Sequence, residues 1–328
     1  MILQFHKMRH CLILFLGFSF FSCGQGSKDK EAVQFGVDQT TSVSLVVLGT
    51  VQDAGSPHIA CEKVCCDTLF KEPDASRKVV SLGIVDYIAQ KTFLFEATPD
   101  MTTQLRDLRL EAGFKVTDNP DGIFLTHAHI GHYTGLVYLG KEAVNAKKVP
   151  VYAMSKMKGF LENNGPWSQL VDNQNIAITP LENNKEIKIT AQLKVIPLTV
   201  PHRDEYSETV GYKIIGPTKK VLFIPDIDKW QKWKTSIVSE IEKVDYAFLD
   251  ATFYDAEEIN NRDISEIPHP FVVESMELFK NLSPREKKKV HFIHFNHTNP
   301  LLNNKSKQAQ GVLANGFAIA TKGNTIKL

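Results

Sequence analysis

The sequence has no marked excess of charge of either sign. Its 328 residues include 38 Lys plus Arg and 37 Asp plus Glu, which gives a formal net charge of +1. Since nucleic-acid-binding domains are usually strongly basic, this balance argues against binding to nucleic acid. The sequence also lacks internal repeats, long low-complexity blocks and a glycine-rich phosphate-binding loop. Its hydrophobic content of 43%, with 23% charged residues, indicates a folded globular protein.

The apolar run near the amino terminus is too short to span a bilayer. It covers residues 11–21, whereas a spanning helix needs about 20 apolar residues. Lys7 and Arg9 precede the run, and a serine followed by Cys23 ends it. This order is typical of an export signal, and the cysteine resembles the lipidated residue of a bacterial lipoprotein. We therefore expect residues 1–22 to be a lipoprotein-type signal peptide, with an ordinary secretory signal as the alternative.

Lipidation of Cys23 would anchor the protein at a membrane without a spanning helix. The expected location is outside the cytoplasm, on a membrane that faces the periplasm or the cell exterior. The polar segment that follows, within residues 23–41, reads as a tether. No later stretch resembles a linker, so residues 42–328 are expected to form one domain.

Short β-rich runs alternate with helical patterns in this domain, which is typical of a layered α/β fold. The predicted strands are Val43–Leu48, Val79–Val85, Thr92–Phe95, Gly122–Thr126, Val149–Ala153, Leu193–Ile196, Val210–Ile215, Val221–Ile224, Tyr246–Leu249 and Val290–Phe295. The predicted helices are Met101–Ala112, Leu136–Ala146, Lys229–Glu242 and Phe271–Lys280.

Three histidines lie close together after one predicted strand. His127 and His129 are two residues apart, so their side chains point the same way in an extended chain. His132 can return to them if the chain turns at Gly131. Three neutral imidazoles that meet at one point suit a borderline cation such as zinc. This loop is therefore a predicted metal site.

Other candidate ligands also follow predicted strands. His202 comes after one strand, and His294 lies at the end of another, in which His291 is expected to be structural. Asp226 and Asp250 each end an apolar strand; we expect Asp226 to bind metal, whereas Asp250 is either a ligand or a helix cap. These two aspartates are the candidate catalytic residues.

These residues resemble the pattern of the metallo-β-lactamase superfamily, which has a His-x-His-x-Asp-His loop after a strand, then a distant His, an Asp and a last His. Thr126 to His132 match the loop, and His202, Asp226 and His294 match the later positions. The motifs Leu48-Gly49-Thr50, Pro201-His202 with Gly211-Tyr212, and Ile293-His294 with Thr298-Asn299-Pro300 look most like the pyrroloquinoline quinone biosynthesis protein B branch. Related cyclic phosphodiesterases of the phosphonate pathway share this layout. The resemblance implies a four-layer αβ/βα sandwich.

One position departs from the superfamily pattern, because Gly131 stands where a metal-binding Asp is usual. The resemblance implies a first metal held by His127, His129 and His202. A second metal would keep three ligands, His132, Asp226 and His294, but would lose one carboxylate. We therefore expect one tightly bound metal and a second that is weaker or absent.

Cysteine is scarce, with five residues in the chain. Cys11 lies in the predicted signal and Cys23 would be lipidated, which leaves Cys61, Cys65 and Cys66. Neighbouring cysteines are poor disulfide partners, and three thiols cannot pair fully. The resemblance to the phosphodiesterases implies that these three cysteines and His297 bind a structural zinc, with His58 as a substitute ligand. Free buried thiols and a mixed redox site are the alternatives.

The leading functional hypothesis is a metal-dependent hydrolase of small molecules, since a bound metal lowers the pKa of water to about 7. Ester, phosphodiester and amide substrates suit this chemistry. An oxidative enzyme that uses iron is the second hypothesis, because histidine and carboxylate suit iron too. The third is a non-catalytic metal-binding lipoprotein whose site has decayed at Gly131.

Overall fold

The computed structural model describes residues 42–116, 119–259 and 267–328. The predicted signal peptide (residues 1–22), the lipidation site Cys23 and the tether (residues 23–41) lie outside the described residues. Among the helices of the described residues, none combines the length and the apolar character that a membrane span requires.

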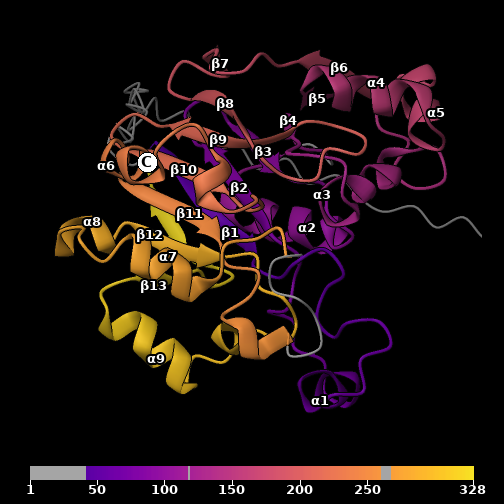
Figure 1. Ribbon diagram of the computed structural model, residues 1–328. Helices are drawn as coiled ribbons and strands as arrows, with labels where there is room; N and C mark the ends of the chain where they lie inside the picture. Colours follow the sequence, from indigo (N-terminus) through magenta and orange to yellow (C-terminus); the bar gives the residue numbers. More distant parts are fainter. Residues whose placement is uncertain (1–41, 117–118, 260–266) are drawn as a thin grey trace, which may run out of the picture. The chain divides into compact units, whose positions relative to one another are not determined.

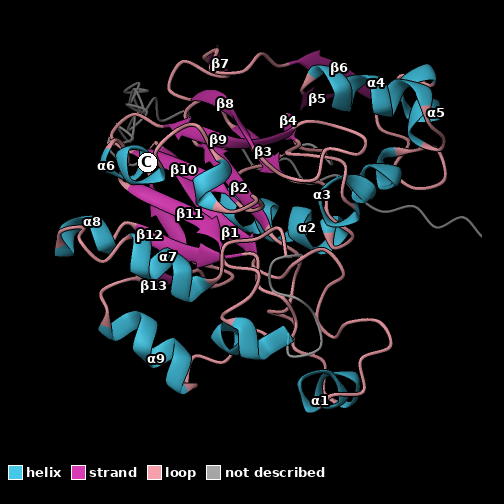
Figure 2. Cartoon of the chain, viewed as in Figure 1, coloured by secondary structure: helices cyan, strands magenta, loops and turns pink. Residues whose placement is uncertain are grey.

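The described residues form two seven-stranded mixed sheets (Figure 2). In the first sheet the order is β14-β1-β2-β3-β4-β5-β6, and in the second it is β13-β12-β11-β10-β9-β8-β7. The first sheet contains β1 (Val43–Gly49), β2 (Ser81–Asp86), β3 (Lys91–Phe95), β4 (Gly122–Phe124), β5 (Val149–Ala153), β6 (Ile176–Pro180) and β14 (Thr325–Lys327). The second contains β7 (Ile187–Lys188), β8 (Lys194–Val200), β9 (Thr209–Ile215), β10 (Lys220–Ile224), β11 (Tyr246–Asp250), β12 (Val290–Ile293) and β13 (Ala318–Ile319).

Helices cover the outer faces of both sheets (Figure 1). The α-helices are α1 (Val64–Lys71), α2 (Met101–Ala112), α3 (Ile130–Tyr133), α4 (Ser155–Asn163), α5 (Trp167–Asp172), α6 (Ile237–Glu242), α7 (Val272–Leu278), α8 (Pro284–Lys287) and α9 (Lys307–Ala314). Short 3-10 helices are η2 (Thr134–Leu139), η3 (Trp230–Lys232), η4 (Ala256–Ile259) and η6 (Pro300–Leu302).

The alternation of side chains along the strands builds the layers. On β1, Val43 and Leu45 point into a core shared by the two sheets, whereas Val46 and Leu48 point to the opposite face. That opposite face packs on α2, α4 and α5, and the outer face of the second sheet packs on α6, α7 and α9. Because successive strand residues face opposite sides, one apolar strand serves two cores. The result is the predicted four-layer α/β sandwich.

Several predicted elements differ from those observed. The helix predicted over Lys229–Glu242 is two separate pieces, η3 and α6, because Trp233 is extended and Ser236 begins a new helix as its N-cap. The helix predicted over Leu136–Ala146 is only η2, which ends where Gly140 adopts an extended conformation. The strand predicted to reach Phe295 ends at Ile293, since His294 has a positive φ of 68°.

Candidate metal centre

The candidate site lies where strands of the same direction end. In the first sheet β1, β3 and β4 run in one direction, and in the second β8, β10, β11 and β12 do so. Ligands collect at the carboxyl ends of strands in such sheets. The loops after these strands carry the histidines and carboxylates that the sequence analysis singled out. Backbone pairing of Val51 with Phe295 joins the loops after β1 and β12.

A first donor group consists of three histidines and a shared aspartate. His127, His129, His202 and Asp226 each offer one ligand atom, and these atoms lie within 4.8 Å of one another. The Nε2 atom of His127 lies 3.2 Å from Oδ2 of Asp226, and Nε2 of His202 lies 3.2 Å from Oδ1. Nδ1 of His129 lies 2.8 Å from Nε2 of His127. The structure thus brings the predicted first-site residues together.

A second donor group shares the same carboxylate. Asp53, His132, Asp226 and His294 also offer ligand atoms within 4.8 Å of one another. Nε2 of His132 lies 3.9 Å from Oδ2 of Asp226, the oxygen that also faces His127. Asp226 therefore lies between the two groups, as a bridging ligand would. Asp53 is a member that the sequence analysis did not find.

Neighbouring groups fix the orientation of three imidazoles from behind. Nδ1 of His127 lies 2.8 Å from Oγ1 of Thr126, and Nδ1 of His294 lies 2.8 Å from Oγ1 of Thr252. Nδ1 of His132 lies 3.3 Å from the fully buried carboxylate of Glu96. Contacts of this kind hold metal-binding histidines in place and set which nitrogen faces the metal.

The arrangement fits a metal ion because several buried polar atoms have no hydrogen-bond partner. They include both ring nitrogens of His202 and Oδ1 of Asp226. Unpaired buried polar atoms cost free energy, so each needs a reason. Nε2 of His202 and Oδ1 of Asp226 lie 3.2 Å apart without hydrogen-bond geometry. Their lone pairs are available to a shared cation, which the imidazole and carboxylate donors would suit.

Asp250 supports the site from behind. It is completely buried, and its oxygens accept hydrogen bonds from the backbone amides of Ile227 (3.1 Å) and Thr252 (2.9 Å) and from the Thr252 hydroxyl (2.7 Å). Through Thr252 it holds His294. These contacts place Asp250 behind the metal-facing residues, where it holds them in position, while its assignment as a catalytic residue stays a prediction.

His269, which the sequence analysis missed, lies between Asp226 and Asp250. Its Nδ1 is 2.9 Å from Oδ2 of Asp250 and 3.2 Å from Oδ1 of Asp226. Burial lowers the pKa of His269, but the two carboxylates outweigh burial and raise it to about 10. Two prolines flank this residue in the sequence, and no periodic pattern marks it. Its proximity to two acids is visible only in the folded chain.

The buried aspartates remain ionised because histidines surround them. Burial raises the pKa of Asp226, but the charges of His202 and His269 lower it by more. The resulting pKa is well below the usual value for an aspartate. The pKa of Asp53 is also well below its usual value, since His132 and His294 outweigh the effect of burial. Ionised carboxylates are the form that binds metal ions.

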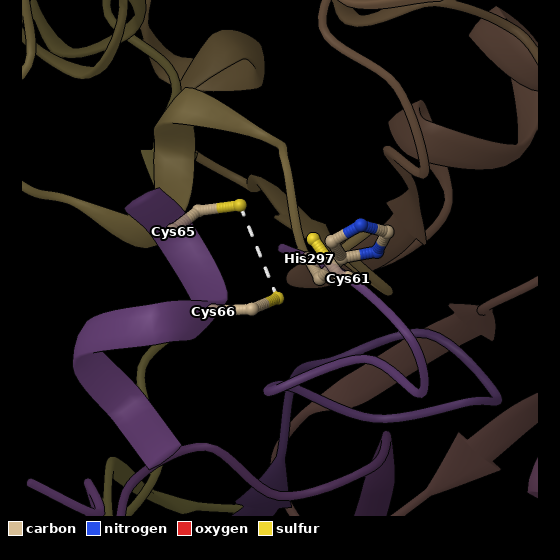
Figure 3. A group of neighbouring side chains, drawn as sticks. All are labelled: Cys61, Cys65, Cys66 and His297. Atoms are coloured by element: carbon tan, nitrogen blue, oxygen red, sulfur yellow. Dashed lines mark hydrogen bonds between the residues drawn. The ribbon is translucent and has the colours of Figure 1, made fainter. Parts of the chain in front are cut away.

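Three cysteines and a histidine form a further cluster, which shares no residue with these groups (Figure 3). Cys61, Cys65, Cys66 and His297 offer ligand atoms within 4.8 Å of one another. The thiols are free, with the Sγ atoms of Cys65 and Cys66 at 3.9 Å. Burial and the neighbouring Cys66 raise the pKa of Cys65 to about 12. A cation would remove that mutual repulsion, so the set suits a structural zinc.

His58 lies beside this cluster without entering the group of four. Its ring lies against that of His297, with the centroids 4.3 Å apart and the planes tilted by 30°, and its backbone amide donates to Sγ of Cys66 at 3.3 Å. The geometry therefore gives His58 a supporting position. The zinc itself stays a prediction.

Comparisons with known proteins agree with this layout. A family model described as a beta-lactamase superfamily domain matches residues 91–295. Coenzyme PQQ synthesis protein B of Xanthomonas euvesicatoria pv. vesicatoria is 21% identical over 308 residues, which cover 87% of this chain and 99% of the relative. Its counterpart in Methylobacillus flagellatus is 24% identical over 310 residues, which cover 86% of this chain and 99% of the relative.

Solved structures show the same fold. Zn²⁺-bound PqqB from Methylobacterium extorquens has a TM-score of 0.70 at 19% identity, with 87% of this chain and 100% of that chain covered. A diphosphatase of the PhnP family has a TM-score of 0.57 at 22% identity, with 87% of this chain and 96% of that chain covered. The chain belongs to the beta-lactamase superfamily and has the metallo-β-lactamase fold.

Proposed function

We propose that this protein is a metal-dependent hydrolase that attacks an ester, phosphodiester or similar small substrate with water. The observation that carries the proposal is the pair of donor groups that share Asp226. A metal bound there would supply an activated water with a pKa of about 7 and would polarise the bond to be cleaved. The similarity to a diphosphatase of the same fold supports a phosphorus-containing substrate without selecting one.

Two residues of the donor groups have partly exposed side chains. His129 and Asp53 have side chains 14% and 12% exposed, whereas His132, His202 and His294 are at most 1% exposed. A substrate therefore approaches past His129 and Asp53. Nε2 of His129 lies 3.4 Å from the half-exposed Glu205, which orients this imidazole at the entrance.

An iron-dependent oxidative reaction is the second candidate. The specific observation in its favour is the sequence similarity to the PQQ synthesis proteins B, which extends over 99% of their length. Both donor groups consist of imidazole and carboxylate, which suit iron as well as zinc. Metal analysis of the purified protein distinguishes the two candidates.

The test combines metal identification with assays on generic phosphodiester and lactone substrates. We expect zinc and a hydrolytic activity that His127→Ala abolishes. His291→Gln is the matched control, because His291 lies outside both donor groups and its replacement should leave activity intact. Activity that persists in His127→Ala would refute the hydrolase, and so would bound iron without hydrolysis. Bound zinc without any reaction on these substrates would favour the non-catalytic lipoprotein.

We also propose that Cys61, Cys65, Cys66 and His297 hold a structural zinc. Thiol titration of the native protein, with and without chelator, tests it. We expect the thiols to react slowly until the chelator removes the metal. Three thiols that react freely at once in the untreated native protein would exclude the site.

The location of the protein is a further proposal, supported by the sequence alone. We propose export and a lipid anchor at Cys23, with a small-molecule substrate and without a nucleic-acid partner. Detergent partitioning of the wild type against Cys23→Ala tests the anchor. We expect the wild type in the detergent phase and the variant in the aqueous phase, and equal partitioning would contradict the proposal.

A further inference from the structure

The close approach of Asp53 to Gly131 explains why this loop has a glycine. A Cβ atom placed on Gly131 would lie 2.4 Å from Cα of Asp53 and 2.8 Å from its Oδ1. Real Cβ atoms essentially never approach other heavy atoms so closely, and the nearest atom here is backbone, which cannot rotate away. The space in which a side chain at position 131 would begin is therefore filled by Asp53.

Asp53 brings its carboxylate to the metal-facing side of two histidines. Its Oδ1 lies 2.8 Å from Nε2 of His132 and 3.4 Å from Nε2 of His294. The other nitrogens of these rings face away from Asp53, towards Glu96 at 3.3 Å in His132 and towards Thr252 at 2.8 Å in His294. The nitrogens that face Asp53 are thus the ones left free to bind a metal ion.

The loop that carries Asp53 is tied to the segment that carries His294. The amide of Gln52 donates to the carbonyl of Phe295 at 2.8 Å, and the amide of Phe295 donates to the carbonyl of Thr50 at 2.8 Å. Val51 also pairs with Val79. These bonds on both sides of the loop hold Asp53 at a defined position, as a ligand requires.

We propose that Asp53 is the carboxylate ligand of a second metal ion and replaces the one lost at Gly131. The other ligands of this ion would be His132, His294 and the shared Asp226. The carboxylate has moved from the histidine loop to the loop after β1, so the donor set keeps its chemistry. This inference rests on the proposed function only in requiring a metal in this pocket.

The test counts metal ions by site. The protein is loaded with Co²⁺, because thiolate-rich sites give intense charge-transfer bands whereas histidine and carboxylate sites give weak ligand-field bands. Total cobalt and competition with a chromophoric chelator give the number and affinity of the bound ions. The variants are Asp53→Ala and the isosteric Asp53→Asn. Asp74→Ala is the control, since Asp74 lines the same surface cavity as Asp53 but belongs to neither donor group.

We expect two ions outside the cysteine cluster in the wild type and in Asp74→Ala, and one in Asp53→Ala. Asp53→Asn should weaken the second ion by at least about tenfold, the lower end of what loss of even an outer-shell partner costs. The thiolate band should remain in all variants and show that they are folded. If Asp53→Ala does not fold, the affinity of Asp53→Asn for the second ion tests the proposal instead.

Two results would overturn the inference. One is a second ion that binds Asp53→Ala, or a folded Asp53→Asn, as tightly as it binds the wild type. The other is a wild type with a single ion outside the cysteines. If His127→Ala removes that single ion together with hydrolysis, the proposed function stands and only the role of Asp53 fails.

Discussion

Restoring the superfamily residue at position 131 should damage the site. In the superfamily pattern the loop has an Asp there, so sequence reasoning alone predicts that Gly131→Asp improves binding of the second metal. The structure predicts the opposite, because the new Cβ would meet Cα of Asp53 at 2.4 Å. Either the Asp53 loop or α3 must move, and both carry second-site ligands.

The size of the effect follows from the overlap. Ordinary van der Waals contact begins at 3.4 Å, so the backbone of one loop must shift by about 1 Å. Overpacking of this kind typically costs ~1–3 kcal/mol. Replacing a helical glycine with alanine raises helix stability by at most ~1 kcal/mol, which offsets part of this cost. Relative to a helical glycine-to-alanine change without a clash, we therefore expect Gly131→Ala to lower the free energy of unfolding by about 1–3 kcal/mol, and we expect Gly131→Asp to lose the second metal as well.

Urea unfolding and cobalt stoichiometry measure the two effects. Gly159→Ala is the matched control, because Gly159 lies within α4 and a Cβ there meets nothing within 4 Å. This control should be neutral or slightly stabilising. A Gly131→Ala protein as stable as Gly159→Ala would refute the steric argument. Tighter binding of the second metal by Gly131→Asp would refute the exchange of carboxylates.

Three more predictions test other parts of the molecule. Thr252→Val removes the hydroxyl that holds His294, so we expect metal affinity to fall by roughly 10–100-fold in chelator competition, and unchanged affinity would contradict this. Burial lowers the pKa of His291 to about 4 from the model-peptide value 6.5, so its stability contribution is complete above pH 6.5 and is lost as the pH falls towards 4. His291→Gln should therefore lose about 2 kcal/mol less stability than the wild type between pH 7 and pH 5 in urea unfolding, and equal losses would count against burial as the cause. Cys66→Ser should lower the zinc content by one equivalent while Asp67→Ser, on the exposed side of the same helix, should not; equal zinc contents would argue against the cysteine site.

The strands whose apolar residues alternate between two cores were predictable from the sequence. The short strands at the edges of the sheets were not. β5 (Val149–Ala153) and α2 (Met101–Ala112) have the predicted bounds, and Gly113 ends α2 in the left-handed conformation. The short strands β7, β13 and β14 escaped prediction because they hold two or three half-buried or exposed residues each. Such strands are fixed by pairing with a neighbour, which leaves little periodic pattern in the sequence.

The same distinction applies to the site. The histidines were predictable because they cluster after strands, and the structure brings them together as expected. Asp53 and His269 have no such mark, since Asp53 lies in a turn and His269 lies between two prolines. The close approach of Asp53 to Gly131, 78 positions apart in the sequence, is the observation behind the proposed replacement of the missing carboxylate. Compensation between distant loops is invisible to a reading of local patterns.

The charge of the site suits two divalent cations. Four carboxylates, from Asp53, Glu96, Asp226 and Asp250, are buried or nearly buried there. In the part of the chain that the structure describes, their ion pairs are with histidines. A protonated imidazole balances a carboxylate but cannot bind a metal. Two divalent cations would balance all four carboxylates while the metal-binding histidines stay neutral. With one cation, the remaining carboxylates would need protonated histidines as partners, and Asp53 would pair with His132 and His294 instead of with a metal. Asp53 thus contributes to the charge balance as well as to the ligand set, so its removal should release a whole cation rather than weaken a single bond.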